Sequence, residues 1–271
     1  MDAFRDRVAV ITGGAGGIGM AMARAFAARG AKVVLADLDE PALLRALSEL
    51  QEAGAAVLAV PTDVTNLESV QALASAARKH FGGAHIVCNN AGIALFGEMR
   101  QATHRDWVYT MNVNFWGVVH GIEAFVPLLI EQGQGGHIVN TASMAGLVGM
   151  HWLGIYCASK FAVVGTSEAL HRELKAHGIG VSVLCPMIVD TQINQNSVRM
   201  RPAELRNSAA ELPLPDADAM AGGTIPADEV ARRVVRGVDR GDLYILTHPE
   251  QREFLRRRAA KLDAMFESDT W

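Results

Sequence analysis

Three polar side chains in the second half of the sequence have the types and spacing that an alcohol–ketone reaction needs. Tyr156 and Lys160 are four residues apart in a stretch of helical periodicity, so both project from one face of a helix. A neighbouring ammonium favours the phenolate, and we expect it to lower the pKa of the tyrosine toward working pH. Ser143, thirteen residues before Tyr156, could polarise the substrate oxygen. Because such a pair usually lies on a solvated helix, it indicates catalysis only beside a coenzyme site.

A glycine-rich turn near the N-terminus could supply that coenzyme site. The segment Thr12–Gly19 (TGGAGGIG) follows an apolar, strand-like run and precedes a helical pattern. Glycines let backbone N–H groups approach a diphosphate, and the start of a helix adds partial positive charge. Strand, turn and helix in this order favour a dinucleotide-binding loop over an ordinary tight turn. Its expected coenzyme contacts are Thr12, Gly13, Gly17, Ile18 and Gly19.

Asp37, which closes the second strand-like run, is placed to choose between coenzymes. A carboxylate there accepts hydrogen bonds from the adenosine ribose and repels a 2′-phosphate. Neither Ala15 nor Leu38 offers a cation for such a phosphate, so we expect NAD rather than NADP. The alternative is that Asp37 merely caps the following turn. Asp63 and Val64, after the third strand-like run, could receive the adenine.

The rest of the pattern alternates short apolar runs with longer amphipathic stretches. Near-continuous hydrophobicity is typical of strands buried on both faces of a parallel sheet. Seven runs are expected to be strands: Arg7–Thr12, Lys32–Ala36, Val57–Val60, Ala84–Asn89, Gly136–Thr141, Gly180–Cys185 and Leu243–Leu246. Six stretches are expected to be helices: Ile18–Arg29, Pro41–Ala53, Leu67–Phe81, Thr103–Glu131, Ile155–His177 and Ala227–Arg240. The alternation predicts a single α/β domain with a Rossmann-like, doubly wound, seven-stranded, mostly parallel sheet and helices on both faces.

The set of motifs resembles the classical short-chain dehydrogenase/reductase family over essentially the whole chain, from Arg7 to about His248. The glycine turn matches the family's T-G-x-x-x-G-x-G, and residues 89–92 read N-N-A-G. Residues 140–143 (NTAS) end on the family's serine, and Tyr156–Lys160 matches Y-x-x-x-K. These motifs in this order are a highly specific signal, and they agree with the strand–helix pattern.

The resemblance implies a role for each matching residue. Tyr156 would be the general acid/base, Ser143 would hold the substrate oxygen, and Lys160 would bind the nicotinamide ribose and lower the tyrosine pKa. Asn114 would anchor a water molecule in a proton relay; Asn112 is a competing candidate, although helix register favours Asn114. Besides Tyr156 and Lys160, the coenzyme contacts that the resemblance implies are Asn90, Ala91, Gly92, Pro186, Ile188 and Thr191.

One position departs from the family pattern, because Met187 follows Pro186 where the family usually has glycine. A side chain there could narrow the nicotinamide end or face the substrate. The residues between Ser143 and Tyr156 are mostly apolar, which favours a bulky hydrophobic alcohol over a sugar. The alternative for each is a core or subunit contact. Expected substrate contacts are Ser143, Tyr156, Met144, Met150, Trp152 and Met187.

The stretch from Thr191 to Thr224 breaks the strand–helix rhythm. It is polar and rich in proline and glycine, and it follows a strand's carboxyl end, where ligands bind on open α/β sheets. We expect a substrate lid with helix-like pieces such as Pro202–Ala210, rather than a disordered insertion. After a domain over residues 1–250, a helical tail over 251–271 is locally basic. A solvated face or an intersubunit contact is favoured there over a nucleic-acid arm.

Composition excludes several classes of protein. Half of the 271 residues are hydrophobic and the net charge is −4, so we expect neither nucleic acid nor an anionic membrane as a partner. Three cysteines without metal-ligand spacing predict no disulfide framework and no metal site, and they fit a reducing cytoplasm. The N-terminus lacks a signal-peptide pattern, and apolar runs are short for a membrane span.

Together these observations predict an NAD-dependent oxidoreductase that interconverts a hydrophobic secondary alcohol and its ketone. The substrate would be aromatic, alicyclic, or steroid- or terpenoid-like. Two alternatives stay open: an NADP-dependent carbonyl reductase of the same family, and a non-catalytic protein that senses dinucleotides. The resemblance also implies a homotetramer or homodimer, joined through helices at Thr103–Glu131 and Ile155–His177.

Overall fold

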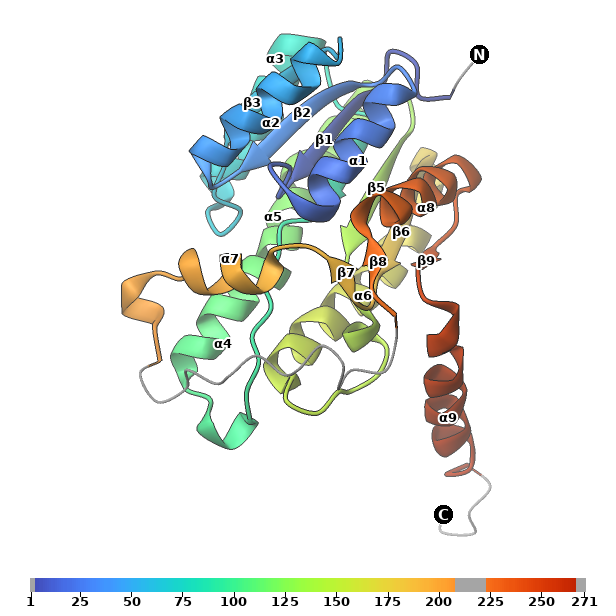
Figure 1. Cartoon of the computed structure of the whole chain (residues 1–271). Helices are drawn as coiled ribbons and strands as arrows, with labels where there is room; N and C mark the ends of the chain where they lie inside the picture. The colour runs from blue at the N-terminus through green and yellow to red at the C-terminus, as the bar shows by residue number, and fades with distance from the viewer. Residues whose placement is uncertain (1–2, 208–222, 267–271) are drawn as a thin grey trace.

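A single seven-stranded sheet forms the centre of the protein (Figure 1). The computed structural model describes residues 3–207 and 223–266. All strand pairs in the sheet are parallel, in the order β3-β2-β1-β4-β5-β6-β9. The strands are β1 (Val8–Thr12), β2 (Lys32–Asp37), β3 (Val57–Pro61), β4 (Ile86–Asn89), β5 (Gly136–Thr141), β6 (Ile179–Cys185) and β9 (Tyr244–Leu246). The predicted Rossmann-like sheet and its seven strands are confirmed.

Helices cover both faces of this sheet. The α-helices of the described residues are α1 (Gly17–Ala28), α2 (Glu40–Glu52), α3 (Leu67–Phe81), α4 (His104–Met111), α5 (Gly117–Gln132), α6 (Gly154–Leu174), α7 (Ile193–Arg199), α8 (Ala227–Arg240) and α9 (Arg252–Asp263). Helices α1, α2 and α8 bury apolar side chains against one face of the sheet, and α3, α5 and α6 against the other. Because side chains alternate along a strand, Ile11 of β1 faces the first layer and Val10 faces the second.

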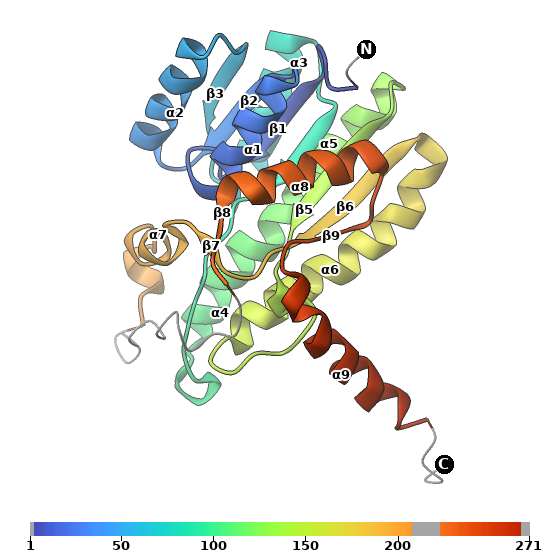
Figure 2. The same cartoon turned by 45° about the vertical axis from the view of Figure 1, so that its right-hand side comes forward.

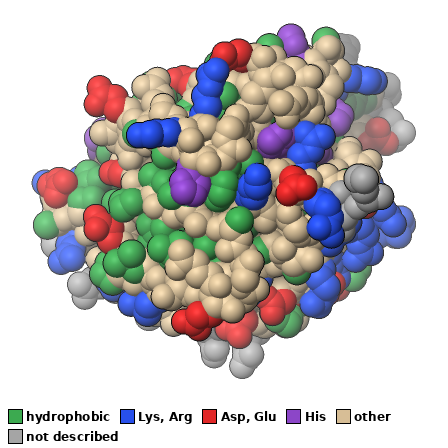
Figure 3. Space-filling view, turned by 90° about the horizontal axis from the view of Figure 1, so that it is seen from above, with side chains coloured by type: hydrophobic (Ala, Val, Ile, Leu, Met, Phe, Trp, Pro, Cys, Tyr) green, Lys and Arg blue, Asp and Glu red, His purple; other side chains and the backbone are tan. Residues whose placement is uncertain are grey.

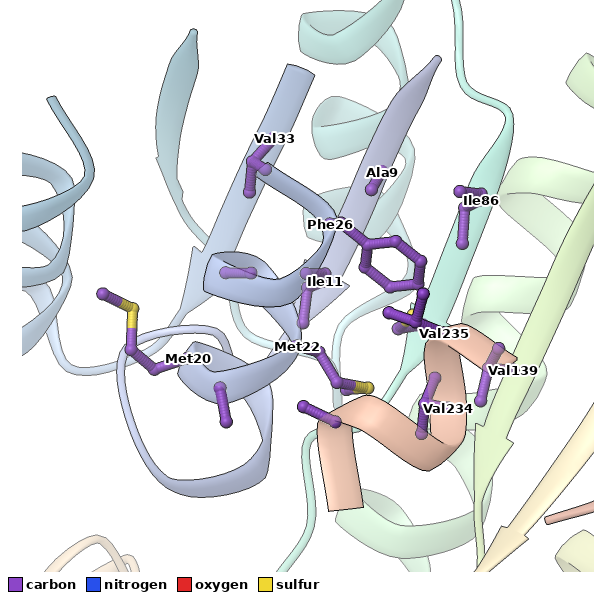
Figure 4. Packing of buried hydrophobic residues seen from close by; sticks show 14 of the residues in the cluster. Ala9, Ile11, Met20, Met22, Phe26, Val33, Ile86, Val139, Val234 and Val235 are labelled. Carbon is purple, nitrogen blue, oxygen red and sulfur yellow. The ribbon is translucent and has the colours of Figure 1, made fainter. Parts of the chain in front are cut away.

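Phe26 is at the centre of the first layer (Figure 4). Its ring is fully buried between α1, α8 and the sheet, close to Ile11, Ile86 and Val235. Full burial of a phenylalanine side chain contributes about 2–3 kcal/mol relative to leaving it exposed. This packing holds α1, the helix that follows the glycine turn, against the sheet.

The expected long helix at Thr103–Glu131 is interrupted. A π-helical turn (Asn112–Trp116) joins α4 to α5, and the Gly117 N–H reaches back five residues to the Asn112 carbonyl. Such a turn shifts the helical register locally, and it brings Asn114 to full burial. By length and composition the run His104–Gln132 could cross a membrane. Its buried side chains, such as Phe125 and Leu129, pack instead in the second layer against the sheet.

The segment expected to form a lid begins and ends at a second, two-stranded sheet. Strands β7 (Val189–Asp190) and β8 (Ile225–Pro226) pair in parallel. Between them the chain forms α7, which the sequence did not predict, and a 3₁₀ turn at Ala203–Leu205. The helix-like piece expected at Pro202–Ala210 is therefore reduced to that turn among the described residues, and its last three residues lie outside them.

In the described part of the tail, α9 ends at Asp263 and residues 264–266 form a turn. Helix α9 extends away from the body of the protein (Figure 2). No residue of α9 is buried, and Leu262 is exposed. On the face seen from above, basic and acidic side chains are scattered among polar and apolar ones (Figure 3).

Candidate active site

The glycine turn lies between the carboxyl ends of β1 and β4. The Thr12 hydroxyl accepts hydrogen bonds from the N–H groups of Asn90 and Ala91, at 2.9 and 3.1 Å. The Asn90 amide donates to the Thr12 carbonyl at 3.0 Å. The predicted segments Thr12–Gly19 and 89–92 therefore lie side by side at the point where the strand order reverses, the usual place for a dinucleotide, and we call this place the coenzyme groove.

Two glycines of the turn are required by its shape. Gly13 has φ of +62°, a left-handed conformation that favours glycine. A Cβ on Gly19 would lie 2.0 Å from the Gly13 carbonyl oxygen, so no other residue fits there. Around Gly16 a Cβ would meet nothing within 4 Å. Ile18, the remaining predicted contact, is half-buried in the first turn of α1. A tight turn with one open side at a helix start fits a diphosphate.

Asp37 lies beside this turn. Its carboxylate accepts the Ala15 N–H at 3.0 Å and the Asp39 N–H at 3.1 Å. These bonds are what the alternative role of Asp37, capping a turn, requires. They also hold the carboxylate at the mouth of the groove, where its remaining lone pairs could accept further hydrogen bonds. Asp39 in turn caps α2 by accepting the Ala42 N–H. It also pairs with Arg199 of α7 at 2.6 Å, a contact between residues 160 positions apart.

The two residues expected near the adenine lie at the neighbouring edge of the sheet. Asp63 accepts hydrogen bonds from both the N–H and the hydroxyl of Thr65, so its side chain stabilises a turn. The Val64 carbonyl accepts a hydrogen bond from His120 Nδ1 at 2.8 Å, and Val64 is buried. Hydrogen bonds therefore hold both residues in place in the loop that follows β3.

Ser143, Tyr156 and Lys160 come together at the carboxyl end of β5. Ser143 Oγ donates to the Pro186 carbonyl at 3.2 Å and accepts the Ala145 N–H at 3.1 Å. The Ser143 side chain lies close enough to the Tyr156 hydroxyl to lower its pKa as a hydrogen-bonding neighbour. Lys160 Nζ donates to the Thr141 carbonyl at 2.9 Å and lies 5.6 Å from the centre of the Tyr156 ring. The structure thus brings the three predicted residues into one cluster.

Burial sets the protonation of this cluster. It raises the pKa of Tyr156 to about 12, and the hydrogen bond with Ser143 only partly offsets this. It lowers the pKa of Lys160 to about 8. This differs from the expected low tyrosine pKa, because desolvation disfavours the phenolate and the ammonium lies beside the ring. Within the protein chain alone, Tyr156 is therefore a neutral hydroxyl at neutral pH.

Asn114 stands next to this cluster. Its amide donates to the Ile93 carbonyl at 3.0 Å and to Ser159 Oγ at 3.1 Å, and its oxygen accepts the Ile93 N–H at 2.8 Å. A Cβ on Gly92 would lie 3.3 Å from Asn114 Oδ1 and 3.5 Å from Lys160 Nζ. Asn114 and Lys160 therefore face the same point of the groove, which supports Asn114 over Asn112.

The residues expected at the nicotinamide end are held by a histidine that the sequence did not single out. His248 is 3% exposed. Its Nδ1 accepts the Met187 N–H at 3.3 Å, and its Nε2 lies 3.1 Å from the Ile188 carbonyl and 3.0 Å from the Gly223 carbonyl. Because both partners of Nε2 are carbonyl oxygens, Nε2 is the donor in these bonds and Nδ1 the acceptor. His248 thus ties Met187, where the family usually has glycine, to Ile188 just before the lid segment and to Gly223 near its end. Thr191 lies against the glycine turn, since a Cβ on Gly17 would be 3.1 Å from the Thr191 methyl group.

The expected substrate contacts outside the cluster differ in how far they are buried. Met144 is 1% exposed and therefore a core residue, whereas Met150, Trp152 and Met187 are half-buried. Trp152 has φ of +63°, and its carbonyl accepts the Gly97 N–H. A small hollow beside the start of α6 is lined by residues 95–98, 101, 102, 106, 154 and 155. It contains none of these four residues, although Leu95 and Phe96 give it an apolar wall.

Comparisons with known proteins agree with this geometry. Residues 7–202 match the family described as short chain dehydrogenase. The chain is 41% identical over 204 residues to 1-deoxy-11-beta-hydroxypentalenate dehydrogenase from Streptomyces exfoliatus, covering 74% of both chains. It is 34% identical over 261 residues to C alpha-dehydrogenase from a Sphingobium species, covering 95% of this chain and 85% of the relative.

A solved structure is similar over nearly its full length. It is a short chain dehydrogenase/reductase from Burkholderia phymatum in complex with NAD, with 41% identity and a TM-score of 0.91. The match covers 98% of this chain and 97% of that one. The fold, the order of the motifs and these similarities agree, and the chain belongs to the short-chain dehydrogenase/reductase family of oxidoreductases.

Proposed function

We propose that this protein is an NAD-dependent oxidoreductase that interconverts a hydrophobic secondary alcohol, aromatic, alicyclic, or steroid- or terpenoid-like, and its ketone. The cluster of Ser143, Tyr156 and Lys160 beside the groove carries the proposal. A hydroxyl donor, a partly buried phenol and a buried amine can hold the substrate oxygen, protonate it during reduction and deprotonate it during oxidation. A protein that only sensed dinucleotides would have no chemical need for all three.

NAD is the proposed coenzyme, and the chain offers a site that fits it. The backbone around Gly13–Gly19 would hold the diphosphate, and Asp37 would accept the ribose hydroxyls. Asn90, Ala91 and Gly92 would line the groove, with Asp63 and Val64 toward the adenine. Pro186, Ile188 and Thr191 would contact the nicotinamide end. The Burkholderia relative was solved with NAD, which supports this choice.

In the proposed reaction, the coenzyme supplies or accepts a hydride at the carbinol carbon. Ser143 Oγ holds the substrate oxygen, and Tyr156 takes the hydroxyl proton during oxidation and returns it during reduction. Lys160 stabilises the phenolate that forms, because a cation near the ring lowers the cost of a buried negative charge. Asn114 and the Ile93 carbonyl provide polar groups where a water molecule could relay the proton outward.

An apolar substrate is supported by the residues around the cluster. Leu95 and Phe96 line the hollow beside α6, and Met150, Phe161 and Tyr156 pack against one buried apolar cluster that includes Leu153. Burying the hydroxyl groups of a sugar against such a wall would cost free energy, because the wall offers them no hydrogen-bond partners. Met187 and Trp152 are the partly exposed side chains that we propose as further substrate contacts.

Two segments outside the cluster complete the proposal. Residues 191–207 and 223–224, the described parts of the lid segment, lie beside the groove and would cover the bound substrate.

The π turn and α5 expose Trp116, which is 47% exposed, and Ile130, which is 39% exposed. These side chains support the proposed subunit contact, in a homodimer or homotetramer, through α4–α5 and α6.

The test is formation of NADH from a panel of aromatic carbinols, alicyclic alcohols, steroids, terpenoid alcohols and simple secondary alkanols, with sugars as polar controls. We expect turnover with one of the bulky classes and little with sugars. NADPH formation from NADP in the same panel tests the alternative coenzyme. Tight NADH binding without turnover of any alcohol or ketone would contradict the proposal and favour a sensing role.

A further inference from the structure

Helix α7 crosses the mouth of the coenzyme groove. Just before it, Thr191 lies against Gly17 of the turn after β1. In its middle, Ser197 Oγ accepts the Ala94 N–H, from the loop after β4, at 2.8 Å. At its end, Arg199 reaches Asp39, in the loop after β2, at 2.6 Å. Because β2, β1 and β4 are neighbours in the sheet, this one segment touches all three loops that border the groove. Figure 1 shows α7 lying across from the ends of β1 and β2.

The contact on the β2 side is an ion pair with one well-shielded partner. The Asp39 side chain is 15% exposed, whereas the Arg199 side chain is 56% exposed. The Ala42 N–H and Arg199 both lower the pKa of Asp39, so the carboxylate is charged at neutral pH. Arg199 also donates to Asn196 of its own helix at 3.2 Å, which orients the guanidinium. Each side chain of the ion pair is therefore also oriented by a second hydrogen bond.

The other end of the segment is anchored far more firmly. Arg201 pairs with Asp106 of α4 at 2.6 Å, and both side chains are buried, at 10% and 4% exposure. Asn207 donates to the same carboxylate at 2.7 Å. The Tyr109 hydroxyl donates to the Ser197 carbonyl at 2.9 Å. Breaking a buried pair leaves an uncompensated charge, whereas an exposed pair opens at little cost. The α4 side is therefore a fixed anchor, and Arg199–Asp39 is the weaker contact.

We propose that the Arg199–Asp39 ion pair is a latch that retains the coenzyme, and that the rate of NADH release is set in part by its opening. The inference rests on the proposed coenzyme. Asp39 is two residues past Asp37, which would hold the adenosine ribose, so the latch closes the adenosine half of the groove. When it opens, α7 can lift from the β2 side while Arg201 and Asp106 keep the segment attached to α4.

Four variants separate the latch from an ordinary surface ion pair. Arg199→Ala removes the cation, and Arg199→Lys keeps the positive charge but replaces the planar guanidinium with a single ammonium. Asp39→Asn removes the anion but keeps an oxygen that can cap α2 at the Ala42 N–H. The double variant Arg199→Ala/Asp39→Asn completes a double-mutant cycle. Arg78→Ala is the matched control, because Arg78 pairs with Glu131 at 2.8 Å and is 57% exposed, remote from the groove.

The readout is the release rate of NADH, followed by the fluorescence of the bound coenzyme in stopped flow. We expect Arg199→Ala and Asp39→Asn to release NADH about threefold to tenfold faster than the wild type. The double variant should be no faster than either single variant, Arg199→Lys should be intermediate, and Arg78→Ala should match the wild type. The ratio of Arg199→Ala to wild type should fall toward one in about 1 M salt.

Other results would overturn the latch. Wild-type release rates in Arg199→Ala or Asp39→Asn, or additive effects in the double variant, contradict it, as does an equal acceleration in Arg78→Ala. None of these measurements requires turnover of an alcohol. A protein that binds NADH but oxidises no alcohol would therefore contradict the proposed reaction while the release rates still judge the latch.

Discussion

The Lys160 ammonium lies 5.6 Å from the centre of the Tyr156 ring and donates its hydrogen bond to the Thr141 carbonyl, not to the phenol. Ser143 is the neighbouring side chain that lowers the pKa of Tyr156. Desolvation thus moves the two pKa values in opposite directions, raising the pKa of Tyr156 to about 12 and lowering the pKa of Lys160 to about 8. In the protein chain alone, the cluster is adapted to hold a neutral phenol beside an amine that can lose its proton.

The low pKa of Lys160 has a consequence for stability. Below pH 8 the lysine is protonated in both the folded and the unfolded chain, so the folded state bears the full cost of the buried charge. Between about pH 8 and pH 10.5 the folded chain loses the proton first, and stability should rise with pH. Lys160→Met removes the charge, so its free energy of unfolding at pH 7 should exceed that of the wild type, by up to about 3 kcal/mol.

Thermal unfolding of both proteins from pH 6 to pH 10 checks this expectation. The advantage of Lys160→Met should shrink above pH 8, because the wild type is then neutral at this position as well. A variant that is less stable than the wild type at every pH would show that the bond to Thr141 outweighs the cost of the buried charge.

The phenolic hydroxyl should be indispensable for turnover. Tyr156→Phe keeps the ring and its packing but removes the proton carrier, and we expect a loss of about 10²-fold to 10⁴-fold in kcat. NADH binding, measured by fluorescence, should persist. Tyr244→Phe is the control, because Tyr244 bonds Glu168 on the surface at 2.6 Å and lies on β9. Undiminished turnover in Tyr156→Phe would remove Tyr156 from the proposed reaction.

Asp37 should determine the coenzyme preference. Asp37→Ala removes the acceptors for the ribose hydroxyls and the charge that repels a 2′-phosphate. Since hydrogen bonds to a charged group contribute about 1.5–3 kcal/mol, the Kd for NAD should rise about 10-fold to 100-fold. The Kd for NADP should change little or fall. Asp37→Asn keeps an acceptor and should show a smaller rise. Titration of both coenzymes measures this, and a wild-type preference for NADP would contradict our interpretation of the carboxylate.

Much of the fold and the site was predictable because the signals are local. Each strand of the sheet is a short apolar run, and each motif has a fixed spacing, so Tyr156 and Lys160 could be placed on one helix face from sequence alone. The tertiary consequences were not predictable. A π turn has the same apolar pattern as an α-helix, and it forms because Asn114 finds partners at Ile93 and Ser159.

Contacts between distant segments were also out of reach. Arg199 and Asp39 are 160 residues apart, and neither belongs to a motif. His248 bonds the carbonyl of Gly223 only because β9 ends beside the lid segment. The pKa values of Tyr156 and Lys160 depend on how deeply each is buried, which spacing along a helix does not report.

Gly121 of α5 should be essential for stability, because it lies directly against a buried amide. A Cβ there would come 1.9 Å from Asn89 Oδ1, and Asn89 is 2% exposed. Asn89 cannot turn aside freely, since its amide donates to Asn140 Oδ1 at 2.9 Å. Gly121→Ala should therefore cost about 1–3 kcal/mol through overpacking. Gly165 of α6 is the matched control, because a Cβ there meets nothing within 4 Å. Gly165→Ala should stabilise the helix by about 0.5–1 kcal/mol. Urea unfolding of both variants measures the difference, and equal shifts would show that Asn89 can move away from the added methyl group.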